Sequence, residues 1–431
     1  MRPSTLRRVA GHVLDGRTEV TIVSAMAPQQ PDRLLRALLR EARVRRIAVR
    51  LLVADITASF RFLDTEAERE LAAGGLAITM LAGSVPRRLA ARVDSMPVSL
   101  GEIDRLLAAG EVPCDVFVVR MQRGQDGRLE LCNAVGYTMT MLARPDVTVA
   151  VEAVAGGGYV PGLCPVGPEL LGGAIIWDDD SGPPGAAASS PPAADAVRDR
   201  IAANLARFVP SDATLQVGIG GVAEALIGAL AGRADIGFHS GILPNALRAR
   251  LAAGDFAGSA KTADPGLAVC TSLAPDAGAE PWPASVRLRP LAETHSPEAL
   301  ARHERLWAIN SAFSVDLRGQ VNAEWAGGLK VACGAGQLDF ARAAHASPHG
   351  AAVIALPART SLGASRIVAR LDADAAVTTP ANDVDYVVTE YGVARLAGRT
   401  LGERARALTA VSHPDDRTLL AHMRQDDTGA P

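Results

Sequence analysis

The 431-residue sequence has few aromatic residues, only two lysines and no excess of either charge. Aromatic residues make up 4%, and 44 Lys+Arg side chains are balanced by 47 Asp+Glu side chains, for a formal net charge of -3. A nucleic-acid-binding protein is expected to carry a basic face with aromatic stacking platforms. The composition therefore gives no indication of a nucleic-acid partner.

Long hydrophobic runs and paired cysteines are also missing. The longest apolar stretches, such as Val147–Val151 and Ala351–Leu356, are far shorter than the roughly 18 residues of a membrane span. The five cysteines form no Cys-x-x-Cys pair, which argues against a disulfide framework or a structural zinc site. No apolar segment follows the basic N-terminus, so it does not read as a secretory signal. We therefore expect a cytoplasmic protein without a membrane partner or a bound metal.

What the chain does contain is enough apolar sequence, 48% with 21% charged residues, for sizeable cores. At about 100–200 residues per domain, its length predicts two or three domains. The Pro-, Gly-, Ala- and Ser-rich segment Asp178–Asp195 predicts a linker between an N-terminal domain, residues 1–177, and a C-terminal domain, residues 196–431. A recognition segment is the weaker alternative, because no PxxP spacing or charge cluster accompanies it.

Both halves alternate short apolar runs with helical patterns. This order predicts an α/β fold with two open, largely parallel sheets and a cleft between the domains. Ligands of such folds bind beyond the carboxyl ends of the strands, where glycine-rich turns lead into helices. The predicted helices are Asp32–Arg43, Ala196–Phe208 and Val222–Ala231, and the predicted strands are Val20–Ser24, Ile47–Ala54, Leu76–Leu81, Val116–Arg120, Val147–Val154, Thr214–Val217, Leu306–Ile309, Ala352–Leu356, Ala376–Thr378 and Tyr386–Val388.

A first glycine-rich turn follows the predicted strand Thr214–Val217. Gly218, Gly220 and Gly221 would let backbone N–H groups approach a ligand oxygen or phosphate. The pattern lacks the third glycine of a dinucleotide fingerprint, and no P-loop lysine follows. A tight strand-to-helix turn without a ligand is the alternative.

A second small-residue segment runs from Cys333 to Phe340. Gly334 and Gly336 precede Gln337, an arrangement that could form a backbone nest for an oxyanion. A packing turn capped by Asp339 explains the same residues equally well.

Two polar segments could supply catalytic side chains. His239 is a candidate general base beside Ser240, although neighbours on an extended chain point in opposite directions and a lone histidine is more often structural. Glu390 and Tyr391 lie just past a predicted strand, where site residues collect. For these two, a strand end followed by a solvated helix is the simpler interpretation.

The segment Ile309–Asn322, INSAFSVDLRGQVN, resembles a motif of the acetyl-CoA hydrolase/CoA-transferase family. The closest similarity by pattern is to the butyryl-CoA and 4-hydroxybutyrate CoA-transferases. The resemblance extends in family order over Ala196–Leu420 and more loosely over Ser24–Pro31 and Met121–Leu142. Its further matching segments are Leu215–Gly220, Gly237–Ser240, Gly336–Phe340, Ser365–Val368, Val387–Ala394, Arg404–Leu408 and Ser412–Asp415.

This resemblance implies a homodimer of two-domain chains that bind acyl-CoA as a substrate in the cleft, with no tightly bound cofactor. It also implies a glutamate nucleophile that passes through an acyl anhydride and a glutamyl-CoA thioester. Oxyanion donors would come from Gly218–Gly221, with Gly220 at the reaction centre, and from Gly334–Gln337. Arg366, in a matching segment, would contribute to CoA binding.

The sequence departs from the family pattern at the reaction centre. Gly241 stands where the family has its nucleophilic glutamate, and Asn245 stands at the next acidic position. Cys333 and Ala335 replace two glycines of the second loop, and Pro380 replaces an arginine. Because the framework motifs remain, these changes indicate a site rebuilt for another reaction.

Three interpretations follow. The first is direct transfer of the acyl group from the thioester to an amine, hydroxyl, carbanion or water, with His239 as the nearest base and Asn245, Cys333 and Tyr391 near the substrate. The second is ordinary CoA transfer through another carboxylate, Glu324 or Glu390. The third is a silent CoA-binding or scaffold subunit.

Overall fold

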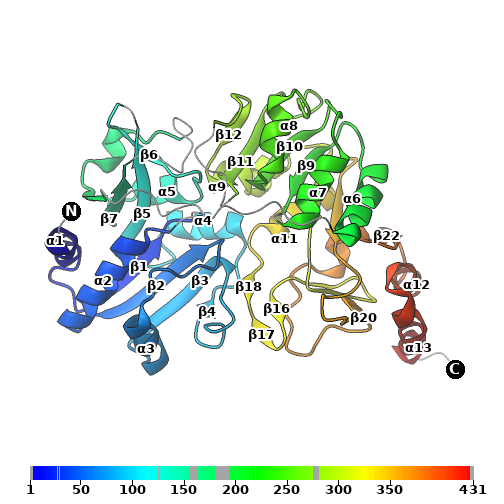
Figure 1. Cartoon of the computed structure of the whole chain (residues 1–431), viewed down its shortest axis with the longest axis horizontal. Helices are drawn as coiled ribbons and strands as arrows, with labels where there is room; N and C mark the ends of the chain where they lie inside the picture. The colour runs from blue at the N-terminus through cyan, green and yellow to red at the C-terminus, as the bar shows by residue number, and fades with distance from the viewer. Residues whose placement is uncertain are drawn as a thin grey trace.

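The chain forms two α/β lobes that lie side by side (Figure 1). The structure is a computed structural model that describes residues 3–26, 28, 30–124, 126–155, 164–179, 195–218, 220–274 and 281–427. The predicted linker lies almost wholly outside these residues, so the domain boundaries stay a prediction. Among the described residues, no helix is both long and apolar enough to cross a membrane.

The N-terminal lobe is built on a sheet of order β18-β3-β2-β1-β5-β7-β8. Its neighbours from β3 to β8 are parallel. Successive residues of one strand are buried in different cores, as Leu51 and Leu52 are, because helices cover both faces. The strands are β1 (Glu19–Ser24), β2 (Ala48–Asp55), β3 (Leu76–Ser84), β4 (Asp94–Ser95), β5 (Val116–Arg123), β6 (Leu129–Leu131), β7 (Thr148–Val154) and β8 (Ile175–Asp179), and the helices are α1 (Pro3–Val13), α2 (Asp32–Arg45), α3 (Thr65–Ala73), α4 (Leu100–Ala108) and α5 (Thr138–Leu142).

The C-terminal lobe has a second sheet of order β12-β11-β10-β9-β13-β19-β21-β22, parallel except for β22. Two smaller sheets lie beside it, one of β14, β15 and β20 and one of β16 and β17. The strands are β9 (Thr214–Val217), β10 (Gly237–Leu243), β11 (Ala268–Leu273), β12 (Val286–Leu288), β13 (Leu306–Asn310), β14 (Ser314–Asp316), β15 (Val321–Asn322), β16 (Trp325–Ala326), β17 (Leu329–Lys330), β18 (Ala332–Cys333), β19 (Ala351–Ala355), β20 (Ile367–Val368), β21 (Tyr386–Thr389) and β22 (Gly392–Arg395). The helices are α6 (Ala196–Phe208), α7 (Gly221–Ala229), α8 (Ala246–Ala252), α9 (Leu291–Thr294), α10 (Pro297–Leu300), α11 (Gln337–Ala346), α12 (Leu401–Val411) and α13 (Arg417–Asp427).

The predicted α/β class is confirmed, and most of the predicted elements are present. The predicted strand Ala376–Thr378 is wrong. Its residues form a loop before Pro380, and the chain there makes only an isolated bridge from Thr379 to Val321. Thr378 instead accepts a hydrogen bond from the backbone N–H of Ala323, so side-chain bonding replaces a strand ladder.

The two lobes are joined through backbone pairing at two places. In the first, β18 from the C-terminal half pairs antiparallel with the end of β3, so that Cys333 lies opposite Gly83 (Figure 1). In the second, the N–H of Val135 donates to Thr271 O at 2.8 Å, and the N–H of Leu273 donates to Asn133 O at 2.9 Å. The carboxyl ends of β3 and β11 are therefore held against the opposite lobe.

Gly83 provides a test of the first junction. It has φ +98°, and a Cβ there would overlap the backbone carbonyl of Asp55 on β2. We expect Gly83→Ala to lower the free energy of unfolding by about 1–2 kcal/mol for the left-handed backbone and by about 1–3 kcal/mol more for the overlap.

Gly16→Ala is the matched control, because Gly16 has φ +70° but no atom within 4 Å of its Cβ position. It should show the backbone cost alone. Denaturant unfolding of both variants checks this, and equal losses would contradict the predicted overlap.

Candidate active site

A cavity of about 250 Å³ lies between the lobes. Val217, Gly241, Ser272 and Asn310 line it from the carboxyl ends of β9, β10, β11 and β13. This is where ligands bind in parallel α/β sheets. Opposite them lie the end of β3 and the segment from β18 into α11. The remaining lining residues are Met26, Ile56, Ala82, Gly83, Ser84, Leu100, Gln216, Gly218, Ile242, Thr271, His295, Ala332, Cys333, Gly334, Ala335, Gly336, Gln337 and Phe340.

Gly241 leaves space that the imidazole of His295 occupies. A Cβ at Gly241 would lie 3.0 Å from His295 Nε2 and 3.2 Å from its Cε1. A Cβ at Gly336, across the ring, would lie 2.6 Å from the same nitrogen. Gly241 on β10 and Gly336 before α11 thus leave the space that Nε2 of His295 occupies.

His295 is fixed by its own short turn. Its N–H donates to Leu291 O at 2.7 Å and closes α9. Thr294 Oγ1 donates to Pro290 O at 3.1 Å and lies 2.8 Å from His295 Nδ1. With the hydroxyl proton assigned to this carbonyl, Nδ1 is the donor to Oγ1 and the lone pair of the neutral ring is on Nε2.

Burial keeps this imidazole neutral. It lowers the pKa of His295 to about 3, with a smaller contribution from His239. Within the described part of the chain, Nε2 has no hydrogen-bond partner. The side chain that lines the cavity therefore holds a buried, neutral nitrogen without a partner among the described residues.

His239, the base predicted from sequence, does not line the cavity. It is 1% exposed, and its Nε2 donates to Thr294 O at 3.0 Å. Its ring packs against His303 at 4.3 Å between centroids. Ser240 makes different contacts, donating to Val217 O at 3.0 Å. The two neighbours thus go to separate partners, and His239 supports α9 from behind His295.

Of the first glycine loop, Gly218 lines the cavity. Gly220, with φ +115°, precedes α7, and a Cβ at Gly221 would lie 2.6 Å from Nε of Arg198. Gly220 and Gly221 are not among the lining residues of the cavity. They form the turn between β9 and α7.

The second loop lines the cavity from Cys333 to Gln337. Ala335 has φ +43°, an unfavourable conformation for a residue with a Cβ. The side chain of Gln337 donates to Thr379 Oγ1 at 3.2 Å. Burial raises the pKa of the Cys333 thiol to about 11, so it is protonated at neutral pH. Asp339 accepts from the N–H of Gly101 in the other lobe at 3.1 Å instead of capping its own helix.

The carboxylates considered from sequence are engaged elsewhere. Glu324 pairs with Lys330 at 3.1 Å, and Glu390 accepts from the N–H of Ala358 at 2.9 Å. None of the described residues that line the cavity is Asp, Glu, Lys or Arg. Its ionisable side chains are those of His295 and Cys333.

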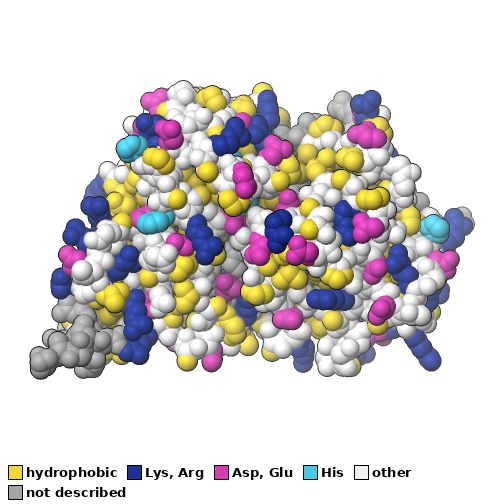
Figure 2. All heavy atoms as spheres, turned by 180° about the vertical axis from the view of Figure 1, so that it is seen from behind, with side chains coloured by type: hydrophobic (Ala, Val, Ile, Leu, Met, Phe, Trp, Pro, Cys, Tyr) yellow, Lys and Arg dark blue, Asp and Glu magenta, His cyan; other side chains and the backbone are white. Residues whose placement is uncertain are grey.

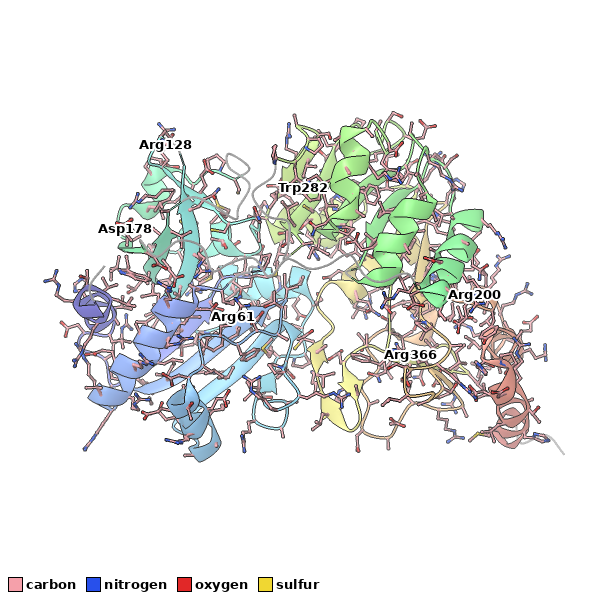
Figure 3. All side chains as sticks on the ribbon, in the orientation of Figure 1. Arg61, Arg128, Asp178, Arg200, Trp282 and Arg366 are labelled. Carbon is pink, nitrogen blue, oxygen red and sulfur yellow. The ribbon has the colours of Figure 1, made fainter. Side chains whose placement is uncertain are left out.

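Three other predicted site residues lie away from the cavity. Arg366 donates to Ala312 O at 3.0 Å. It lies within the C-terminal lobe (Figure 3). Tyr391 is 38% exposed and packs edge-on against His413 on the outer surface. Asn245 precedes α8 without capping it through its side chain.

Sequence reasoning missed two features of the cavity. One is His295, which no recognised motif marked. The other is the pair of Gln216 and Asn310 on adjacent strands, whose amides exchange two hydrogen bonds of 2.9 and 3.1 Å. Their positions at the ends of predicted strands were the available signal for this pair.

The fold is that of CoA-transferase-like proteins. RipA from Yersinia pestis superimposes with a TM-score of 0.82 at 24% identity, over 99% of this chain and 100% of that one. A 4-hydroxybutyrate CoA-transferase from Porphyromonas gingivalis superimposes with a TM-score of 0.71 at 25% identity, over the same shares. The two-lobed fold is therefore common to these proteins.

Sequence comparison finds relatives of the C-terminal half of the chain. Residues 283–423 match the model of the acetyl-CoA hydrolase/transferase C-terminal domain. A 4-hydroxybutyrate coenzyme A transferase from Clostridium kluyveri is 39% identical over 231 residues, 52% of this chain and 53% of that protein. A butyryl-CoA:acetate CoA-transferase from Anaerostipes caccae is 31% identical over 241 residues, 53% of each chain. The match thus spans about half the length of these relatives. Over this half, the chain is similar to members of the acetyl-CoA hydrolase/CoA-transferase family.

Three buried histidines, His239, His295 and His303, should make the free energy of unfolding depend on pH. Burial lowers the pKa of His239 to about 4 and that of His303 to about 2, as it does for His295. In the unfolded chain these groups bind protons below about pH 6.5, whereas the folded protein excludes them. Each therefore lowers the free energy of unfolding by about 1.4 kcal/mol per pH unit as the pH falls below 6.5 towards the folded pKa.

His303→Leu isolates one group, because both ring nitrogens of His303 are buried without a partner among the described residues. We expect the slope of unfolding free energy against pH, between pH 6 and 5, to decrease by about 1.4 kcal/mol per unit. The exposed His422→Leu should leave the slope unchanged. An unchanged slope in His303→Leu would show that His303 protonates in the folded state.

Proposed function

We propose that this chain is an acyl-CoA-dependent acyltransferase that moves the acyl group directly from the thioester to a small acceptor, without a glutamyl-CoA intermediate. The observation that carries the proposal is Gly241 in the lining of a cavity whose described lining contains no carboxylate. A glutamyl thioester needs a carboxylate within reach of the acyl carbon. Here a neutral imidazole fills the adjacent space instead.

The remaining surroundings suit thioester chemistry. Small residues at 333–336 and Gly218 would let a thioester carbonyl approach the backbone closely. Backbone N–H groups aimed at a developing oxyanion typically contribute 10²–10³ in rate each. Direct transfer then requires the enzyme to position thioester and acceptor and to manage one proton.

Ordinary CoA transfer is the second candidate, because the curated relatives carry that activity in their names. Its best carboxylate is Glu324, whose Oε1 lies 3.1 Å from the Cβ position of Gly334, a lining residue. To act as nucleophile, Glu324 would have to leave Lys330 and enter the cavity. Direct transfer needs no such movement.

Mass-resolved chromatography of CoA species separates these candidates. With butyryl-CoA and hydroxylamine, a small neutral amine, we expect free CoA and the hydroxamate, and with acetate we expect no acetyl-CoA. Glu324→Gln should retain hydroxylamine acylation within about twofold. Acetyl-CoA formation that Glu324→Gln abolishes would establish CoA transfer instead, and CoA binding without any turnover would indicate a silent subunit.

A carboxylate introduced at position 241 tests whether Gly241 occupies the position of the missing nucleophilic glutamate. Gly241→Glu alone should lose acylation, because its Cβ presses on the ring of His295. The double variant Gly241→Glu/His295→Ala provides the room and should gain measurable exchange of CoA between butyryl-CoA and acetate. Gly241→Gln/His295→Ala is the matched control without a nucleophile, and equal exchange in both would contradict the equivalence of Gly241 with the missing glutamate.

A further inference from the structure

We propose that His295 is the catalytic general base of this acyl transfer and that the acceptor is a small, uncharged N–H or O–H compound. This inference rests on the proposed function and names the residue and substrate class of the same cavity. It is carried by three features of the site. They are a ring nitrogen without a hydrogen-bond partner among the described residues, the tautomer assigned through Thr294, and the lack of charged side chains in the described lining.

The first feature concerns Nε2. The Cβ positions of Gly241 and Gly336 lie 3.0 and 2.6 Å from this atom, so a side chain at either place would cover it. Phe340 packs edge-on against the ring at 4.9 Å between centroids and holds its orientation. Nε2 is itself buried and has no hydrogen-bond partner among the described residues, in a side chain that lines the cavity.

The second feature is the proton inventory of the ring. Nδ1–H is committed to Thr294 Oγ1, whose own proton goes to Pro290 O. Nε2 can therefore only accept a proton. His239 differs, because its Nε2–H is held by Thr294 O and the ring does not line the cavity.

These features define a balanced reaction. The nitrogen or oxygen of the acceptor attacks the thioester carbonyl carbon, and its proton passes to Nε2 as the new C–N or C–O bond forms. The tetrahedral intermediate then breaks its C–S bond, and the leaving sulfur takes the proton from Nε2. The lowered pKa of His295 favours this return of the proton to the thiolate and opposes proton removal from the free acceptor, so the first transfer must accompany formation of the new bond.

The third feature limits the acceptor. A buried charge must be paired or hydrogen-bonded to avoid a large desolvation cost. Since no Asp, Glu, Lys or Arg lines the described cavity, neither an ammonium nor a carboxylate group finds an opposite charge there. The polar groups that it offers are amide, hydroxyl and imidazole groups, such as those of Gln216, Asn310 and His295. They suit a neutral amine or alcohol.

The experiment measures butyryl transfer to hydroxylamine by the full-length wild type, His295→Gln and His295→Ala. We expect kcat to fall 10²–10⁴-fold in both variants, the range for loss of a general base. Isothermal titration with CoA should give an unchanged Kd. Added imidazole should restore activity to His295→Ala in proportion to its concentration, whereas His303→Leu should keep wild-type activity without it. Methylammonium in place of hydroxylamine should be acylated at least tenfold more slowly.

The failures of the two proposals are distinguishable. Acetyl-CoA formation by the wild type from acetate would overturn direct transfer itself. Hydroxylamine acylation that survives in His295→Gln, or that His239→Gln abolishes instead, would overturn only the role of His295. An acyl adduct on His295 in the quenched wild-type enzyme, detected by peptide mass spectrometry, would make it a nucleophile and overturn the base.

Gly336→Ala offers a second route should the His295 variants fail to fold. It keeps the histidine but places a methyl group against Nε2. We expect a loss of kcat of similar size without a change in CoA binding. Wild-type kcat in a folded Gly336→Ala would contradict the proposed access to Nε2.

Discussion

The site depends on the backbone pairing between the two lobes. Strand β18 belongs by sequence to the C-terminal half, yet it completes the edge of the N-terminal sheet beside β3. On the other side of the cavity, the segment around Asn133 and Val135 bonds to β11. Since each lobe supplies only part of the lining, neither would form this cavity without these junctions.

The electrostatic character of the cavity depends on the charged side chains that its described lining lacks. Charged side chains of both signs are spread over the outer surface (Figure 2), whereas the described cavity lining has none. A buried imidazole is tolerated there because burial keeps it neutral and Thr294 Oγ1 lies 2.8 Å from its Nδ1. The glycine at 241 and the histidine at 295 are thus two parts of one arrangement.

The sequence predicted elements well where local signals agreed. Helix α6 was predicted over Ala196–Phe208, and Asp195 caps its first turn by accepting from the N–H groups of Val197 and Arg198. Strand β9 was predicted equally well because its four residues are all buried between helices. The wrong strand at Ala376–Thr378 shows the limit of such predictions. Three residues are too few to show the alternation of side chains that distinguishes a strand from a packed loop.

The site was only partly predictable. Gly241, Gly218 and the segment 333–337 were identified from sequence and meet at the cavity. His239 was the candidate base because it lies two residues before Gly241 in the chain, but tertiary packing places His295, at the end of a one-turn helix, against Gly241. Arg366 and Tyr391 lie in matching motifs, yet motif membership does not determine distance from the cavity.

The ladder between β18 and β3 also has a mechanical consequence. A hinge that swung the lobes apart would have to break main-chain bonds on both sides of the cavity at once, including the pair formed by Val135 and Leu273. We therefore expect ligands to reach the cavity through local displacements of loops and side chains at its rim, while the two lobes stay joined.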